Sequence, residues 1–258
     1  MKENNLKNYL KKLKKILKKL SKKILKKNIL KYENKLNRDY MIKVAYCNVK
    51  DLDLEKSYPL LPENRKEKAD HFIFDKDKKL SCGAYLLLKK LLDEENIENP
   101  IIETEEDGKP YISNKDNVYF NMSYAGRMVA CAISDSEVGI DIEKIDPLID
   151  MKIAQTFFYN SEYENIKKSE SRVDEFFKYW VLKESYMKYT GLGFLLNLDK
   201  FEIVIDEDEI KVKNQTPELK ENEENIQFSF FDLSPYKLAI SCEEKVDEIF
   251  EYEINDLY

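Results

Sequence analysis

The chain has 258 residues, 43% of them hydrophobic, and a net charge of −7, which suits one large globular domain or two small ones. It contains one histidine, His71, and four widely spaced cysteines with no C-x-x-C pair. These counts argue against zinc hydrolases, Ser-His-Asp triads and disulfide frameworks. They favour a reduced, cytoplasmic protein in which any metal is bound through oxygen.

The first 40 residues differ from the rest in charge. They carry 15 Lys/Arg against three acidic residues, a net charge of +12, so the remainder carries −19. Apolar residues recur every three or four positions, at Leu6, Leu10, Leu13, Leu17, Leu20 and Ile24. This spacing predicts a basic amphipathic helix over 1–40. Three interpretations stay open: weak contact with an anionic membrane or nucleic acid, a solvated extension, or an over-long reading frame before Met41.

From Met41 onward the pattern predicts mixed α and β structure. Helices are expected over residues 63–74, 76–95, 151–168 and 172–191. Strands are expected over 43–49, on both sides of a break within 118–134, and over 138–145, 201–206, 210–214, 226–233 and 236–243. A turn at 105–112 enters a further strand. The order predicts an α+β fold of two similar halves, residues 41–140 and 141–258, because each half combines helices with a group of strands.

Apolar and acidic residues alternate in "VGIDIEKI", residues 138–145. Alternation in a strand places Asp141 and Glu143 on one face. A buried carboxylate is costly unless something positive lies beside it, so this pair needs a counter-charge. A metal, an arginine or water could supply it.

A third carboxylate comes from the helix "YWVLKESYMKYTGLG", where Glu184 and Lys188 are four apart and share a face. Taken alone, this pair suits a stabilising surface ion pair. Together with the strand D-x-E and the turn "GKP" at Gly108–Pro110, it forms a larger set. Three carboxylates and at least two lysines can hold Mg²⁺ and the phosphates that Mg²⁺ bridges.

At these residues the sequence resembles the 4′-phosphopantetheinyl transferase family, in its larger single-chain, pseudo-dimeric class. That class carries a G-K-P turn, an N-x-S-H-[SA]-G segment, a [VI]-G-[IV]-D-[IV]-E strand and a W-x-x-K-E-[AS]-x-x-K helix. Here they read "GKP", "NMSYAG" at Asn121–Gly126, "VGIDIE" at Val138–Glu143 and "WVLKESYMK" at Trp180–Lys188. The resemblance extends from about Met41 to the C-terminus.

The resemblance implies that the chain transfers phosphopantetheine from coenzyme A to a serine of an apo acyl or peptidyl carrier protein. It implies two halves related by a pseudo-twofold axis, an active site at their junction, and a monomer that needs no nucleic acid. The implied Mg²⁺ ligands, with Mn²⁺ as an alternative ion, are Asp141, Glu143 and Glu184. Glu184 and Lys188 are the implied catalytic residues, with Glu184 as the base. The implied contacts of coenzyme A are Arg65, Lys68, Lys109, Ser123, Tyr124 and Lys188.

Two positions need comment. Tyr124 stands where the family usually has histidine, and a phenol donates a hydrogen bond but adds no positive charge. Arg65 and Lys68, three apart on a predicted helix, are candidates for holding the nucleotide 3′-phosphate, with Lys79 as a competitor. A role as solvated side chains is equally compatible with their positions.

Two other functions are compatible with the sequence. One is a different Mg²⁺-dependent phosphotransferase that uses a nucleotide, although no P-loop or kinase motif set is present. The other is a non-enzymatic adaptor that places the basic helix on a membrane and the acidic body on a partner. The adaptor ranks last because it would not need three carboxylates at motif positions.

Overall fold

The computed structural model describes residues 41–105, 108–193, 196–207, 209–214 and 226–258. Met41–Tyr258 forms a compact unit of its own. The basic helix predicted for 1–40 lies outside the described residues. Among the residues that are described, no helix is both long and apolar enough to cross a membrane.

The first sheet has the strand order β11-β1-β5-β4. Its strands are β1 (Ile42–Asn48), β4 (Tyr119–Ala125), β5 (Met128–Ser134) and β11 (Phe250–Tyr252). β1 and β4 are both antiparallel to β5, while β11 runs parallel to β1. Helix α4 (Asp75–Glu94) packs on this sheet, because its leucines at positions 80, 87, 88 and 91 repeat at helical spacing and are buried.

The second sheet has the order β6-β10-β9 and is antiparallel throughout. Its strands are β6 (Val138–Lys144), β9 (Gln227–Leu233) and β10 (Tyr236–Cys242). Helix α7 (Arg172–Thr190) lies against β6 and β10. Its buried aromatic residues, including Phe176 and Tyr186, form a core with Phe201 and Phe228.

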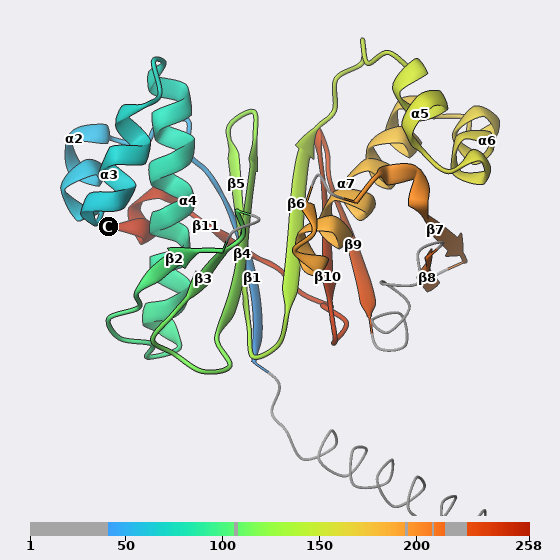
Figure 1. The fold of residues 1–258 in the computed structure, drawn as a ribbon. Coiled ribbons are helices and arrows are strands. Elements are labelled where there is room, and N and C mark those ends of the chain that lie inside the picture. The colour runs from blue at the N-terminus through green and yellow to red at the C-terminus, as the bar shows by residue number, and fades with distance from the viewer. Residues whose placement is uncertain (1–40, 106–107, 194–195, 208, 215–225) are drawn as a thin grey trace, which may run out of the picture. The chain divides into compact units, whose positions relative to one another are not determined.

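The two sheets face each other across a shared apolar core. The first sheet contributes Val44, Ala130 and Ala132, and the second contributes Ile140 and Leu238. Figure 1 shows the resulting layers, with α4 on one side, the two sheets in the middle and α7 on the other side. This confirms the predicted α+β class, and each half has one long helix on one sheet. The pseudo-twofold relation stays a prediction.

The remaining elements surround this framework. On the first half they are α2 (Leu54–Ser57), η1 (Tyr58–Leu60), α3 (Glu63–Asp70) and the hairpin β2 (Ile102–Thr104) and β3 (Pro110–Ile112). On the second half they are α5 (Lys152–Phe157), α6 (Asn160–Lys168), η3 (Leu198–Lys200) and the hairpin β7 (Phe201–Asp206) and β8 (Glu209–Asn214). A last turn, η5 (Ile254–Leu257), follows β11.

Three sequence expectations differ from the structure. The helix expected over 151–168 is two helices, because the Glu162 carboxylate accepts the Tyr159 backbone N–H at 2.9 Å and starts α6 anew. The helix expected over 63–74 ends at Asp70. The division expected at residues 140/141 falls inside β6, and β11 returns from the second half of the sequence to the first sheet.

Helix α7 approaches β6 at backbone distance where β6 has a glycine. A Cβ placed on Gly139 would lie 2.1 Å from the Ser185 carbonyl oxygen and 2.4 Å from the Tyr189 amide nitrogen. The neighbouring side chains are small as well, and the hydroxyls of Ser185 on α7 and Ser241 on β10 are hydrogen-bonded at 2.8 Å. Only glycine permits this approach, and the approach brings the side chains of α7 to the strand that carries Asp141.

We expect Gly139→Ala to be strongly destabilising, because the methyl group would meet backbone atoms that cannot rotate away. Overpacking typically costs about 1–3 kcal/mol, and this contact should reach at least the upper end. Urea unfolding of the variant measures the loss. Lys144→Ala, on the exposed end of the same strand, serves as the control and should stay within about 0.5 kcal/mol of the parent chain. Equal stability of the two variants would contradict the close packing of α7 on β6.

Candidate active site at the junction of the two sheets

Asp141 is the centre of a buried polar cluster drawn from three elements. Its Oδ1 accepts hydrogen bonds from Lys188 Nζ of α7 at 2.6 Å and from Ser123 Oγ of β4 at 2.9 Å. Lys188 Nζ also donates to Ser123 Oγ at 2.9 Å. β4 belongs to the first sheet, whereas β6 and α7 belong to the second half. The cluster therefore lies at the junction, where the sequence predicted the site.

The second carboxylate oxygen of Asp141 is in a different situation from the first. Oδ2 is buried and has no hydrogen-bond partner among the described residues. A buried carboxylate oxygen without a donor is costly, so its presence in a native site calls for an explanation. A cation that binds this oxygen would supply one.

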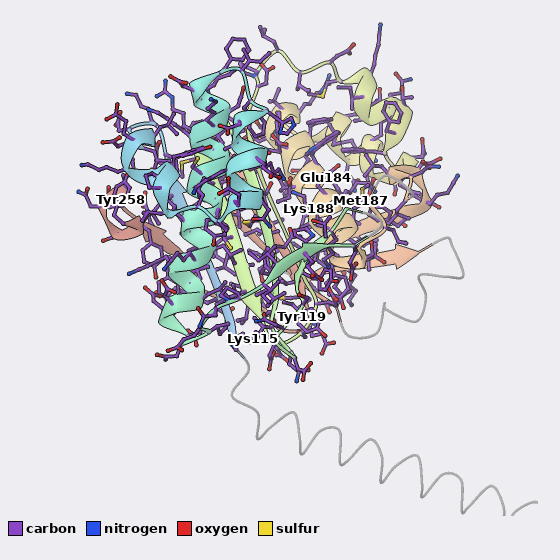
Figure 2. All side chains as sticks on the ribbon, turned by 60° about the vertical axis from the view of Figure 1, so that its left-hand side comes forward. Lys115, Tyr119, Glu184, Met187, Lys188 and Tyr258 are labelled. Atoms are coloured by element: carbon purple, nitrogen blue, oxygen red, sulfur yellow. The ribbon has the colours of Figure 1, made fainter. Side chains whose placement is uncertain are left out.

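Two further carboxylates lie close enough to feel the charge of Asp141. The pKa of Glu143 is raised to about 7, mainly by burial and also by the charges of Asp141 and Glu184, with Lys188 opposing them. Burial also raises the pKa of Glu184, again with Asp141 adding to the shift and Lys188 opposing it. Figure 2 shows Glu184 and Lys188 next to each other on α7. The three carboxylates carry more negative charge than Lys188 neutralises.

These carboxylates do not make a finished metal site by themselves. Within the described ranges, no group of three or more His, Cys, Asp or Glu side chains is arranged so that it could hold a metal ion. The structure thus brings Asp141, Glu143 and Glu184 within electrostatic range of one another without a complete coordination shell. A cation here would need ligands beyond these side chains, such as water or the oxygens of a bound ligand.

A second group of predicted residues gathers around Arg65 on α3. The Arg65 guanidinium lies over the Tyr85 ring at 5.7 Å from its centroid, and Nη2 donates to the Ser81 carbonyl at 3.1 Å. Its Nε is buried and has no hydrogen-bond partner in the described part of the chain. Burial lowers the pKa of Arg65, and the nearby Tyr124 phenol raises it in part. Burial and the Arg65 charge lower the pKa of Lys68.

The two groups meet on β4, because Ser123 and Tyr124 are adjacent and point to opposite sides of the strand. Ser123 is buried against Asp141, whereas Tyr124 is exposed on the side of Arg65. The predicted residues Arg65, Lys68 and Tyr124 are therefore brought together.

Of the other lysines, Lys109 precedes β3 and its side chain reaches the C-terminal end of α7. It donates to the Tyr189 carbonyl at 3.2 Å and pairs with Glu137 at 2.6 Å. Lys79 instead donates to the Lys50 carbonyl at 3.0 Å. Lys109 is therefore positioned beside the residue that follows Lys188, whereas Lys79 Nζ bonds the backbone before α2.

Sequence reasoning missed the pair that fixes α7 from behind. Lys183, the neighbour of Glu184, is fully buried, pairs with Glu162 of α6 at 2.7 Å and donates to the Phe201 carbonyl at 2.9 Å. The Glu162 carboxylate also accepts hydrogen bonds from the backbone N–H groups of Ile203 and Tyr159. In the sequence Lys183 is the first lysine of the W-x-x-K-E-[AS]-x-x-K motif, but the motif alone does not show that it is buried. Its burial orients α7 so that Glu184 and Lys188 face β6.

The arrangement defines a class of protein. Three carboxylates share the charge of Lys188, and a partly desolvated arginine, whose Nε has no hydrogen-bond partner among the described residues, lies near an exposed phenol. Such a combination suits an enzyme that handles a phosphorylated ligand, because phosphates bind both to cationic side chains and to hard cations held by carboxylates.

Comparisons with known proteins identify the family. Residues 137–241 match the 4'-phosphopantetheinyl transferase superfamily, and residues 49–136 match the family described as "4'-phosphopantetheinyl transferase, N-terminal". The chain is similar to 4'-phosphopantetheinyl transferase Sfp of Bacillus subtilis, with 30% identity over 72% of this chain and 84% of the relative. It is also similar to 4'-phosphopantetheinyl transferase psf-1 of Bacillus pumilus, with 31% identity over 74% and 82%. The chain belongs to the 4'-phosphopantetheinyl transferase superfamily, as the motifs predicted, and is a transferase.

A weaker likeness exists among solved structures. The holo-[acyl-carrier-protein] synthase of Helicobacter pylori, crystallised in complex with coenzyme A, is 20% identical with a TM-score of 0.34. The match covers 42% of this chain and 99% of that chain. Neither the fold nor the site described above depends on it.

We expect Lys183→Met to destabilise the chain by about 3–5 kcal/mol, because it leaves the Glu162 carboxylate buried without its cation. The double variant Lys183→Met/Glu162→Gln should recover much of this loss, since it removes both charges. Chemical denaturation of the two variants measures the coupling. The exposed pair Lys167–Glu164 provides the control, and Lys167→Met should cost no more than about 1 kcal/mol. A similar loss in the free energy of unfolding for Lys183→Met and Lys167→Met would show that Lys183 does not hold α7.

Proposed function

We propose that the chain transfers the 4′-phosphopantetheine group from coenzyme A to a serine hydroxyl of an apo acyl or peptidyl carrier protein, with Mg²⁺ as the metal. The observation that carries the proposal is the polar cluster around Asp141 at the junction of the two sheets, within a chain of the 4'-phosphopantetheinyl transferase superfamily. In the reaction the serine oxygen forms a bond to the phosphorus next to the pantetheine arm. The bond from that phosphorus to the bridging oxygen breaks, and adenosine 3′,5′-bisphosphate leaves.

The residues fit a Mg²⁺ ion that the substrate shares. Asp141 Oδ2 is a buried acceptor with no donor among the described residues, and Glu143 and Glu184 add carboxylate oxygens nearby. Mg²⁺ is usually bound through one or two carboxylates plus substrate phosphates and water, so the incomplete protein shell is compatible with it. When bound, the ion supplies neutralisation of charge on the pyrophosphate. Mn²⁺ favours the same kind of ligand and is the alternative.

The side chains around this position provide the other parts of the reaction. Glu184 is the proposed base for the incoming serine, because burial raises its pKa toward the range where a carboxylate accepts a proton effectively. Lys188 is held by Asp141 and Ser123 and stabilises negative charge that develops on the transferred phosphate. Lys109, beside the end of α7, contributes a second cation to the pyrophosphate.

The nucleotide end of coenzyme A fits the group around Arg65. A phosphate there would receive a hydrogen bond from the Tyr124 phenol and would neutralise the charges of Arg65 and Lys68. Burial lowers the pKa of both side chains, and the Arg65 charge lowers that of Lys68 further, so an anion would favour their charged forms. The two groups would therefore bind the two phosphate positions of coenzyme A. The pyrophosphate would lie at the junction and the 3′-phosphate on the side of α3.

The alternative phosphotransferase and the membrane adaptor receive no specific support from the described residues. Membrane contact through 1–40, a monomeric state and a cytoplasmic location stay predictions.

The four cysteines are buried and free, and burial raises the pKa of Cys47 and of Cys242 to about 12.

We expect Asp141→Ala and Glu184→Gln each to lower transfer by about 10²- to 10³-fold or more while the chain stays folded, because each removes a charge that the reaction uses. Intact-mass spectrometry of several apo carrier proteins incubated with coenzyme A and Mg²⁺ measures transfer. Glu251→Gln, on the opposite edge of the first sheet, serves as the control and should leave transfer unchanged. Undiminished transfer by both site variants, or full transfer in excess chelator, would contradict the proposal.

We expect Tyr124→Phe to act mainly on the binding of coenzyme A. A hydrogen bond to a charged phosphate is worth roughly 1.5–3 kcal/mol, which corresponds to a rise in KM of about 10- to 150-fold with much less change in kcat. Steady-state kinetics with a saturating carrier protein measures both constants. Tyr252→Phe is the matched control, since its hydroxyl bonds Glu94 at the far edge of the sheet. A fall in kcat at constant KM would instead place Tyr124 at the reacting phosphate.

A further inference from the structure

The edge of β6 that faces β4 pairs with no other strand among the described residues. β6 is the edge strand of the second sheet and β4 is the edge strand of the first, and the two lie against each other without pairing as strands. At one point a side chain takes the place of a strand. Asn121 Oδ1 of β4 accepts the backbone N–H of Ile140 at 3.1 Å. Because the partner is a donor, the amide oxygen and not its nitrogen must face it.

This contact is buried on both sides. Ile140 is fully buried in the core between the sheets, and Asn121 is buried as well. A buried backbone N–H that loses its acceptor carries a large penalty, so the contact fixes where β6 can lie relative to β4. The next residue along β6 is Asp141.

A second polar contact between the two strands lies two residues further along β4, where Ser123 Oγ donates to Asp141 Oδ1. Asn121 and Ser123 are on one face of that strand, and they reach Ile140 and Asp141 in turn. Asn121 thus holds the backbone and Ser123 holds the carboxylate. Together they set the distance between the half that carries Arg65 and Tyr124 and the half that carries Asp141, Glu143 and Glu184.

We propose that Asn121 is a positioning residue, which holds Asp141 in place through the backbone of Ile140 and so aligns the acidic residues of β6 with the first half of the molecule. The inference rests on the proposed function for its effect on turnover, but the contact itself can be tested without turnover. Asn121 does not touch the reacting atoms. Its loss therefore affects the alignment of the metal and phosphate groups and leaves the Arg65 group intact.

The test compares Asn121→Leu, which keeps the size and removes the acceptor, with Ser229→Ala. Ser229 Oγ of β9 is an equally buried acceptor of a backbone N–H, that of Val246 at 2.8 Å, and β9 is the edge of the second sheet opposite β6. Both variants lose one buried hydrogen bond, but only one of these bonds lies beside Asp141. Asn121→Thr, whose shorter hydroxyl cannot take the place of the amide oxygen, serves as a second variant if Asn121→Leu does not fold.

We expect Asn121→Leu to lower kcat by about 10- to 100-fold, with much less change in the KM for coenzyme A, because supporting residues around a metal site have effects of this size. The affinity for Mn²⁺, titrated by calorimetry in the presence of coenzyme A, should fall in parallel. Hydrogen–deuterium exchange of the peptide that contains β6 should become faster. Ser229→Ala should leave kcat, KM and Mn²⁺ affinity unchanged, although its melting temperature falls.

Parent-like kcat and Mn²⁺ affinity in both Asn121 variants would overturn the inference. So would equal losses of kcat in Asn121→Leu and Ser229→Ala, which would reflect general destabilisation. If the parent chain transfers nothing to any carrier, the proposed function fails. In that case exchange at β6 and Mn²⁺ binding still decide on Asn121, since unchanged values in its variants reject the inference and faster exchange with weaker binding supports it.

Discussion

The hydrogen bonds that Asp141 receives from Lys188 and Ser123 are the interaction on which the rest of the site depends. They join three elements, one from the first sheet, one from the second sheet and one helix. Lys188 reaches Asp141 only because Gly139 lets α7 approach β6 at backbone distance. Behind α7, the buried Lys183–Glu162 pair prevents the helix from rotating away. Packing constraints on both sides of α7 thus position Lys188 beside Asp141.

The same cluster explains why the junction between the halves is the reactive part of the molecule. Apart from the Asn121–Ile140 contact, the core that the two sheets share is formed by apolar side chains. At Asp141 the sheets meet through charge, and burial and the neighbouring carboxylates raise the pKa of Glu143 to about 7, so keeping all three carboxylates ionised is costly without a further cation. Excess negative charge in a buried place favours a cation, and a shared cation in turn favours the phosphates of a ligand. The electrostatics of the free chain therefore suit the substrate that the family implies.

Local patterns in the sequence were sufficient to predict the elements that carry the site. Alternation placed Asp141 and Glu143 on a strand, and four-residue spacing placed Glu184 and Lys188 on one helix face; β6 and α7 have these residues as expected. The partners across the junction could not be predicted, because they depend on contacts between distant segments. Asn121 and Lys183 were visible only as motif residues, and β11 pairs with β1 from about 200 residues away. The break between α5 and α6 was missed for want of a Pro or Gly signal.

The central claim is that one cation is shared between the carboxylates of the junction and the phosphates of coenzyme A. Calorimetric titration of the full chain with Mg²⁺, with and without saturating coenzyme A and without carrier protein, tests it directly. The account predicts weak binding of Mg²⁺ alone and binding tighter by about tenfold or more when coenzyme A is present, within the usual range of coupling between two ligands. The same Mg²⁺ affinity in both titrations would contradict it.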